Sequence, residues 1–147
     1  MVRYSDPKKE ILHTSHTSIP GKVQERIAVF DESEFARLLE LEVIEARDGY
    51  ARVFMPSVKK NNPNGVIHGG AVFSLADHAF GMAANAGTVH RVAVSIHIQY
   101  IAPARGDLEA IAELVAENGR YSTFRVMVYE GDSPVAEFDG VAIRTSS

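Results

Sequence analysis

The chain has 147 residues and contains no cysteine, which excludes disulfides, a cysteine nucleophile and thiolate metal sites. It also lacks a basic excess: the formal net charge is -4, and general nucleic-acid binding needs a basic face. No stretch is long and apolar enough to span a membrane, and the first eleven residues are too charged for a secretory signal. We expect a cytoplasmic protein that binds neither nucleic acid nor membrane and needs no cofactor.

The length and the 46% hydrophobic content suit one domain with a real core. Residues 1–29 are polar and lack sustained periodicity, so we expect an N-terminal extension that is partly ordered at most, followed by a single domain over residues 30–147. The run Asp31-Glu32-Ser33-Glu34 supplies an acidic N-terminal cap before an apolar pattern over 35–41, which predicts a short amphipathic helix. Residues 42–55 alternate and predict a hairpin that turns at 47–49.

A segment that is apolar nearly all round follows from Gly70, which indicates a helix buried on most sides. After it come four strand-like runs at 92–101, 108–116, 121–129 and 135–144, separated by turn-forming residues. An antiparallel β-sheet wrapped around one long central α-helix is the natural assembly, in the α+β class. In the first run, alternation places Val92, Val94, Ile96, Ile98 and Tyr100 on one face. Such a strand could hide its edge by pairing with a second subunit, so we expect at least a dimer.

A polar loop leads into this central helix. Residues 61–65 read Asn-Asn-Pro-Asn-Gly, a cluster of turn formers. Gly69 and Gly70 follow at the helix start, where amide groups lack intrahelical partners and the helix dipole is positive. The two glycines would let a ligand carbonyl approach the backbone, and a developing oxyanion would be stabilised there. A tight turn or close packing is the alternative explanation of the pair.

Asp77 is the one acid on this apolar helix, about two turns from its start. An unpaired carboxylate is costly to bury, so we expect Asp77 to face a cleft or a partner subunit. Desolvation there would raise its pKa, which suits a carboxylate that takes a proton or directs a water near neutral pH. The alternative is that Asp77 belongs to an exposed stripe.

Six positions within sixteen residues resemble the PaaI-like hotdog thioesterases, the phenylacetate-pathway type: Asn62, Gly65, His68, Gly69, Gly70 and Asp77. The family pattern is N-x-x-G-x-x-H-G-G, with an Asp eight residues after the first paired glycine. A looser similarity extends over residues 39–143. The resemblance implies the hotdog fold and hydrolysis of an acyl-CoA thioester to free acid and CoA.

The resemblance also implies roles for these residues. The Gly69 amide would polarise the thioester carbonyl, Asp77 would act as general base or nucleophile, and Asn62 would position the lytic water. His68 would hold the loop or help to polarise the carbonyl. In that family the Asp comes from one subunit and the Asn and glycines from its neighbour. This implies a homodimer with shared active sites, and a homotetramer built as a dimer of dimers is common.

A further hydroxyl from the next strand often assists in this family. Ser95 is the candidate, although spacing from Pro103 matches Ala93 instead. The phosphates of coenzyme A would need local cations, and the candidates are Lys59, Lys60, Arg91, Arg105 and Arg120. Each is equally explained as a solvated charge, but Arg120 occupies a place where similar proteins often have a basic residue near the nucleotide. The acyl group could contact Phe73, Phe80, Met82 and Ile101, which core packing explains equally well.

Other chemistries fit less well. The G-x-x-x-x-G spacing of 65–70 is followed by Ala71 and Val72, where a phosphate loop requires Lys and Ser or Thr. There is no G-x-S-x-G elbow, which argues against a serine triad. The histidines lack the spacing and the acidic neighbours of a metal site, so we expect no bound metal. Two alternatives stay open. One is a hotdog hydratase or dehydratase that uses His68 and Asp77, and the other is a non-catalytic acyl-CoA binder or sensor.

Overall fold

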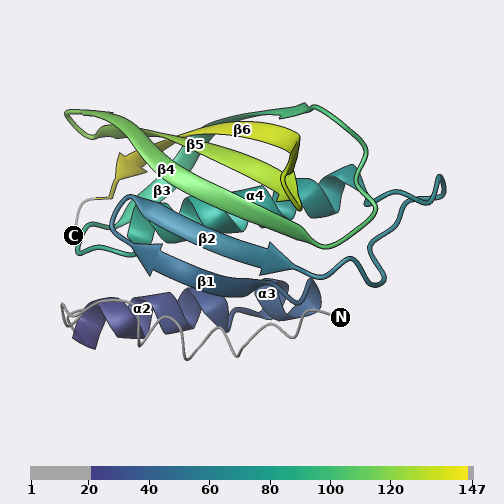
Figure 1. The fold of residues 1–147 in the computed structure, drawn as a ribbon. Helices are drawn as coiled ribbons and strands as arrows, with labels where there is room; N and C mark the ends of the chain where they lie inside the picture. The colour runs from purple at the N-terminus through teal and green to yellow at the C-terminus, as the bar shows by residue number, and fades with distance from the viewer. Residues whose placement is uncertain (1–20, 146–147) are drawn as a thin grey trace.

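The computed structural model describes residues 21–145. A six-stranded antiparallel sheet wraps around one long helix, α4 (Figure 1). The strand order is β1-β2-β4-β5-β6-β3. The elements are α2 (Gly21–Asp31), α3 (Glu34–Leu38), β1 (Glu42–Arg47), β2 (Tyr50–Met55), α4 (Gly69–Asn85), β3 (Arg91–Tyr100), β4 (Leu108–Asn118), β5 (Tyr121–Glu130) and β6 (Ser133–Arg144). The expected hotdog arrangement is confirmed.

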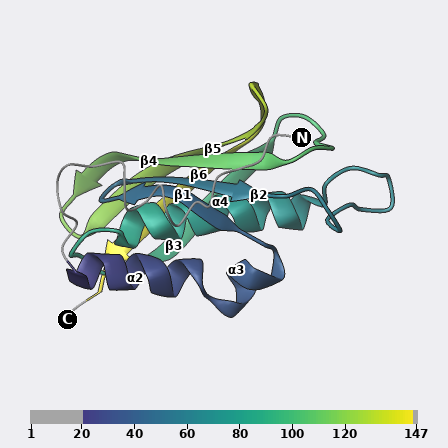
Figure 2. The same ribbon diagram turned by 60° about the horizontal axis from the view of Figure 1, so that its bottom comes forward.

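Helix α4 is central because its sequence leaves no broad polar face to present to water. Ten of its seventeen residues are buried, from Ala71 to Asn85. The sheet covers one side of α4, and α2 and α3 lie on the other side (Figure 2). Phe80 of α4 packs edge-on against Phe124 of β5 and at a tilt against Phe138 of β6. These contacts hold α4 against the sheet. In the described residues, no helix is long and apolar enough to cross a membrane.

Helix α2 is the element that the sequence patterns did not predict. It begins at Gly21, so the expected boundary between residues 29 and 30 falls inside a helix. Val23 and Ile27 are buried, and Phe30 packs against the part of α4 that contains Gly81. Their i, i+4, i+7 spacing was the available signal, but it spans only two turns within a polar segment. Residues 1–20 of the expected extension, which was predicted over residues 1–29, lie outside the described residues.

The predicted hairpins and strands are confirmed. β1 pairs with β2 across the turn at Asp48 and Gly49, and Gly49 has the left-handed backbone (φ 81°) that such a turn requires. Ser33 caps the short helix α3 by accepting a hydrogen bond from the Ala36 amide (3.4 Å). That helix ends at Leu38, earlier than the apolar pattern suggested.

A β-bulge in β3 overturns the expected face of its first half. Ala93 pairs with Ala142 and Ser95 pairs with Val141, so Val94 is an extra residue. Alternate residues of β6 that include Phe138 and Ala142 face the helix and are buried. Ala93 therefore faces the helix together with Ile96, Ile98 and Tyr100, whereas Val92 and Ser95 face outward. The prediction that Val92 and Val94 share the face of Ile96 was wrong because one inserted residue reverses the alternation.

β3 is also an outer strand of the sheet, so one of its two edges has no neighbouring strand within the described chain. Seven of its ten residues are exposed. A long exposed edge of this kind is a surface on which another strand can pair.

Candidate functional site

The N-terminus of α4 presents one free amide. Among its first four backbone N–H groups, that of Gly70 donates to His68 Nδ1 (2.8 Å), and those of Ala71 and Val72 donate to the His68 carbonyl oxygen (2.9 and 3.2 Å). The Gly69 N–H has no acceptor within the described residues. It therefore lies at the positive end of the helix dipole with its hydrogen available to a ligand oxygen.

His68 is the N-cap of α4, and its side chain and its carbonyl oxygen together accept hydrogen bonds from three of the first four amides, which leaves Gly69 without an acceptor among the described residues. Because Nδ1 accepts a hydrogen bond from Gly70, a neutral imidazole carries its proton on Nε2. The His68 amide donates to the Lys60 carbonyl oxygen (2.8 Å), which ties the cap to the segment before the loop. The ring is thus oriented by the backbone and keeps an N–H donor.

The loop before α4 is held by Asn62. Its Oδ1 accepts hydrogen bonds from the amides of Asn64 (2.9 Å) and Val66 (3.3 Å), and its own amide donates to the Val66 carbonyl oxygen (2.7 Å). Gly65, with φ 77°, closes the turn in a conformation that favours glycine. The Asn62 side-chain NH₂ has no acceptor in the described part of the chain, so it can still bind a water.

Tyr100 was not predicted as a site residue. Its hydroxyl donates to the Gly69 carbonyl oxygen (2.9 Å). Its ring lies so close that a Cβ added at Gly69 would sit 3.3 Å from Cζ, tighter than most such contacts. An added Cβ at Gly70 would lie 3.0 Å from His68 Nδ1. The close approach of two aromatic rings therefore favours glycine at both positions, which no local sequence pattern reveals.

Asp77 lies on α4 between Phe73 and Gly81, with its side chain half-buried. Burial raises the pKa of its carboxyl above the usual value. No hydrogen bond or ion pair joins it to another described residue. Eight residues of helix separate it from Gly69, a rise of about 12 Å. One small substrate group therefore cannot contact both residues of the same chain.

Ser95 and Arg91 lie elsewhere than expected. Ser95 is exposed on the outer face of the sheet and does not point toward α4. Arg91 is buried, where its guanidinium donates to the Ala84 carbonyl oxygen (2.8 Å) and to Glu117 Oε1 (2.6 Å). Its Nη1 lies 3.8 Å from Asp48 Oδ1. Arg91 thus satisfies the C-terminal end of α4, and its internal partners leave it poorly suited to bind phosphate.

The other predicted cations divide into two groups. The Lys60 side chain is buried, donates to the Val58 carbonyl oxygen (3.0 Å) and pairs with Glu40 (3.7 Å). Lys59, Arg105 and Arg120 are exposed, and Arg120 lies in the turn between β4 and β5. Among the apolar candidates, Phe80 and Met82 are buried in the core, Phe73 is half-buried against Phe138, and Ile101 is half-exposed.

A cavity of about 330 Å³ opens beside this N-terminus, with walls from α3, the loop and the first turns of α4. Phe35, Leu39, His68, Gly70 and Ser74 are among its lining residues. No group of three or more His, Asp or Glu side chains within residues 21–145 is arranged to hold a metal ion.

Comparison with known proteins agrees with this geometry. Residues 64–137, half of the chain, match the family model of the thioesterase superfamily. The chain belongs to this superfamily. As a member of it, the protein is a thioester hydrolase.

Similarity to individual proteins extends further. The acyl-coenzyme A thioesterase PaaI of Escherichia coli is 30% identical over 121 residues, which cover 80% of this thioesterase and 86% of PaaI. The solved PaaI structure superposes with a TM-score of 0.80 at 27% identity, over 88% of this chain and 98% of that one.

Two other proteins are similarly close. A mutant of the phenylacetic acid degradation protein PaaI of Thermus thermophilus gives a TM-score of 0.73 at 32% identity, over 77% of this chain and 100% of that one. An Archaeoglobus fulgidus protein with a provisional esterase name is 32% identical over 100 residues, 66% of this chain and 65% of that protein.

Proposed function

We propose that this thioesterase hydrolyses acyl-CoA, with the Gly69 amide as the donor to the thioester oxygen. The observation that carries the proposal is the hydrogen-bonding state of the α4 N-terminus. Three of the first four amides have acceptors, and Gly69 alone has none within the described chain. Because the other N–H groups at the start of α4 already have acceptors, the Gly69 N–H is left to donate to a single ligand oxygen. Such a donor is worth roughly 3 to 4 kcal/mol to an oxyanionic transition state.

The remaining groups supply the other steps. The thioester oxygen accepts from Gly69 N–H, and His68 Nε2–H is a second donor beside it. The Asn62 side-chain NH₂ orients a water, and Asp77 removes its proton as the water oxygen bonds to the carbonyl carbon. Collapse of the tetrahedral intermediate breaks the C–S bond, and the proton passes from Asp77 to the leaving thiolate. The raised pKa of Asp77 brings it closer to the pH at which it must both accept and return a proton.

This chemistry requires two copies of the chain. Gly69 and Asp77 of one chain are separated by about 12 Å of helix rise, so the Asp77 that acts on a given thioester belongs to the partner. The exposed edge of β3 supports this assembly, because two copies can continue the sheet by antiparallel pairing across it. Ser95 lies on the outer face of the sheet, away from α4 of its own chain.

A direct route through water and a nucleophilic route through an Asp77 anhydride both use these groups. In a single turnover in heavy-oxygen water, direct attack leaves Asp77 unlabelled, whereas the anhydride route transfers label into its carboxyl. Asp77 is half-buried and has no hydrogen-bond or ion-pair partner among residues 21–145, which suits either route, so isotope incorporation separates them.

Thiol release from aryl-, short-, medium- and long-chain acyl-CoAs tests the function. The native protein should turn over part of this panel. Asp77→Asn, which keeps the shape of the side chain, should lower kcat by about 10²- to 10⁴-fold. Glu34→Gln removes one negative charge from exposed α3 and should leave kcat unchanged. Intact binding of the whole panel without thiol release would refute the proposal and favour an acyl-CoA sensor, and water addition to an enoyl-CoA would favour a hydratase.

A further inference from the structure

Two peptide groups meet at Gly69, and every polar group of the two except one has a partner within the described residues. The peptide that joins His68 to Gly69 carries the free Gly69 N–H, and its carbonyl oxygen accepts from two amides of the next turn (2.9 and 3.2 Å). The peptide that joins Gly69 to Gly70 is held on both sides. Its N–H donates to His68 Nδ1 (2.8 Å), and its carbonyl oxygen accepts from the Tyr100 hydroxyl (2.9 Å). The direction of the free N–H is therefore set by two restrained peptide planes.

Tyr100 is the partner that comes from a distant part of the chain. It is 31 residues from Gly69 and is the last residue of β3. Its ring also lies against Gly69, because an added Cβ there would sit 3.3 Å from both Cζ and the hydroxyl oxygen. Glycine has freer φ and ψ angles than any other residue, so a contact that limits the torsions of Gly69 has a large effect on the orientation of its amide.

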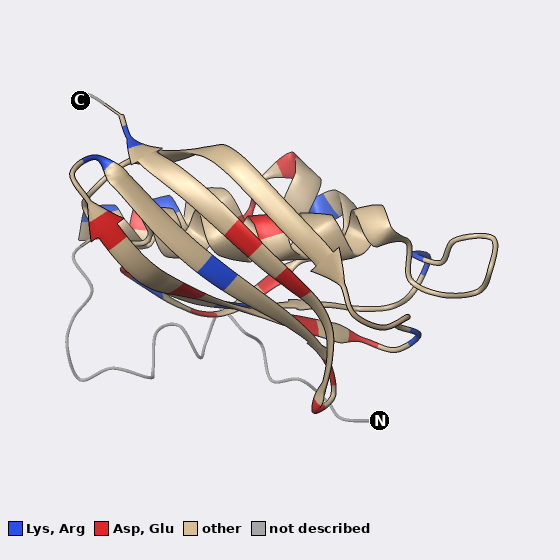
Figure 3. Ribbon diagram, turned by 90° about the horizontal axis from the view of Figure 1, so that it is seen from above, with Lys and Arg blue, Asp and Glu red and all other residues tan. Residues whose placement is uncertain are grey.

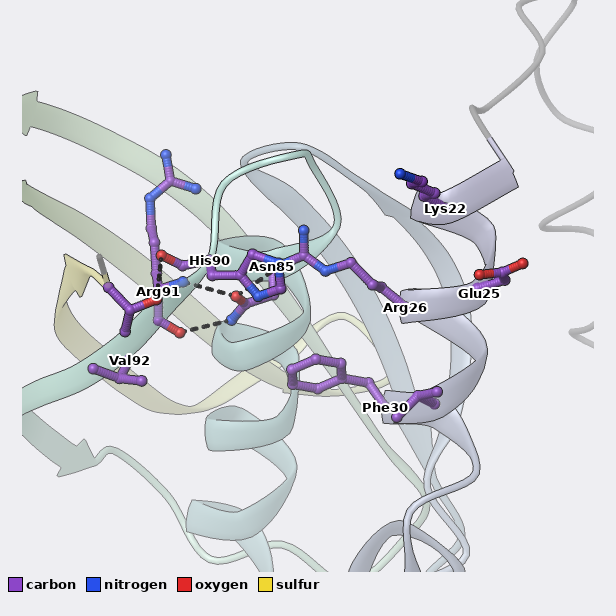
Figure 4. Close-up of a pocket in the computed structure, with 10 residues that line it drawn as sticks. Lys22, Glu25, Arg26, Phe30, Asn85, His90, Arg91 and Val92 are labelled. Atoms are coloured by element: carbon purple, nitrogen blue, oxygen red, sulfur yellow. Dashed lines mark hydrogen bonds between the residues drawn. The ribbon is translucent and has the colours of Figure 1, made fainter. Parts of the chain in front are cut away.

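Strand β3 gives the Tyr100 hydroxyl a firm support, because α4 is bonded to both ends of this strand. At the start of β3, the Arg91 amide donates to Asn85 Oδ1 (2.9 Å), and the Asn85 side-chain NH₂ donates to the Arg91 carbonyl oxygen (3.1 Å), as Figure 4 shows. The Arg91 guanidinium also donates to the Ala84 carbonyl oxygen (2.8 Å). At the other end, Tyr100 bonds to the first residue of α4. Strand and helix thus cannot slide past one another, and a side chain on such a support is held precisely.

We propose that Tyr100 is a positioning residue of this thioesterase, whose hydroxyl orients the Gly69 N–H toward the thioester oxygen. The inference rests on the proposed role of Gly69 as the donor to that oxygen. Tyr100 acts through Gly69 and needs no contact with the substrate. A donor that is already oriented stabilises an oxyanion without reorganising as the charge develops. Loss of the hydroxyl should therefore slow the chemical step and leave substrate binding nearly unchanged.

Packing alone does not require this hydroxyl. Phenylalanine has the same ring and would keep the contact with Gly69. The Tyr100 side chain is about half-exposed, so water can replace its partner, and a hydrogen bond of this kind contributes little to the stability of the fold. An effect of the hydroxyl on catalysis can thus be separated from an effect on folding.

Tyr100→Phe tests the role of the hydroxyl directly. It should lower kcat for acyl-CoA about three- to tenfold and change KM less than about twofold, because one hydrogen bond is lost and only the transition state depends on it. Tyr129→Phe is the matched control and should change neither constant. Tyr129 faces outward on β5, on the side of the sheet where Figure 3 shows charged residues across the outer strands, and its hydroxyl makes no hydrogen bond with another described residue. The proteins are compared at equal oligomeric state, verified by mass, because Tyr100 lies on the exposed β3 edge.

A spectroscopic measurement separates positioning from a purely structural role. Asp77→Asn should bind acyl-CoA without turning it over, and a hydrogen bond from Gly69 should lower the stretching frequency of an isotope-labelled thioester carbonyl. Adding Tyr100→Phe to this protein should reduce the frequency shift, whereas adding Tyr129→Phe should leave it intact. A shift as large with Tyr100→Phe as without it would overturn the inference, and so would an unchanged kcat in Tyr100→Phe.

Failure of the proposed function gives a different pattern. If the native protein releases no thiol, the hydrolytic function is wrong, and the carbonyl shift of the bound thioester still decides whether Tyr100 orients Gly69. If acyl-CoA is hydrolysed but its carbonyl shows no shift in the protein that retains Tyr100, Gly69 is not the donor and the inference fails with it. Hydrolysis with the same kcat and the same shift with and without the hydroxyl leaves the function standing and removes the role of Tyr100.

Discussion

Replacing Gly140 with alanine should destabilise the protein through Phe80. A Cβ at residue 140 would lie 2.8 Å from Cζ of Phe80 and 2.9 and 3.0 Å from the two ring Cε atoms. Phe80 is 2% exposed and is held between Phe124 and Phe138, with ring centroids at 5.4 and 5.7 Å, so the ring has no free direction in which to move. Overpacking of this kind costs about 1 to 3 kcal/mol.

The opposing effect is smaller. Alanine reduces the entropy of the unfolded chain and returns about 0.4 to 1 kcal/mol. We therefore expect Gly140→Ala to lower the free energy of unfolding by about 1 to 2 kcal/mol, measured by urea denaturation, and Tm by roughly 2 to 8 °C. Because Phe80 lies one turn from Asp77, movement of the ring should also lower kcat.

A double-mutant cycle provides the control. Phe80→Leu removes the ring atoms that an added Cβ would meet, so Gly140→Ala should cost less in the Phe80→Leu background than in the native chain. A coupling free energy near zero would refute the reasoning, as would a Gly140→Ala variant at least as stable as the native protein.

Three further predictions concern α4. His68→Ala should lower the free energy of unfolding by about 1 kcal/mol, whereas His68→Asn should retain most of it as a better cap, and equal thermal stability of the two variants would contradict the capping role. Burial lowers the pKa of His78 to about 4, so the folded state binds fewer protons than the unfolded state between pH 6.5 and 4. Stability should be complete above pH 6.5 and fall by about 3 kcal/mol as the pH drops to 4, a slope that His78→Gln should largely remove in pH-dependent denaturation. Arg91→Ala should cost about 1 to 3 kcal/mol, because the Ala84 carbonyl oxygen loses its donor, and urea denaturation with no such loss would contradict a structural role.

The fold was predictable where local chemistry decides it. Short-range patterns predicted these elements: alternating residues gave the strands, Gly49 gave the turn between β1 and β2, and the apolar run gave α4. The structure confirms these predictions. The bulge at Val94 was not predictable, because an extra residue in a strand becomes visible only through its pairing with β6. α2 was missed for a related reason: Val23 and Ile27 are buried only by packing on the core, and this contact is not visible in the local sequence.

The candidate site divides in the same way. The spacing of residues 62–77 located the loop, the helix start and the acid on sequence alone. Spacing could not show that His68 consumes the Gly70 amide and leaves Gly69 free. Nor could it show that the Arg91 side chain is buried and paired with Glu117, because the sequence does not show whether an arginine faces solvent or the protein interior.

Subunit complementation tests the central claim most directly. Asp77→Asn should be inactive, and so should Asn62→Asp, which keeps an oxygen acceptor for the Asn64 and Val66 amides and replaces the NH₂ donor by a charged carboxylate oxygen. In a heterodimer of the two variants, one site carries both changes and the other carries neither. A 1:1 mixture after subunit exchange, verified by mass, should release thiol at about one quarter of the native rate. An inactive mixture that contains the heterodimer would contradict an active site shared between Gly69 of one chain and Asp77 of the other.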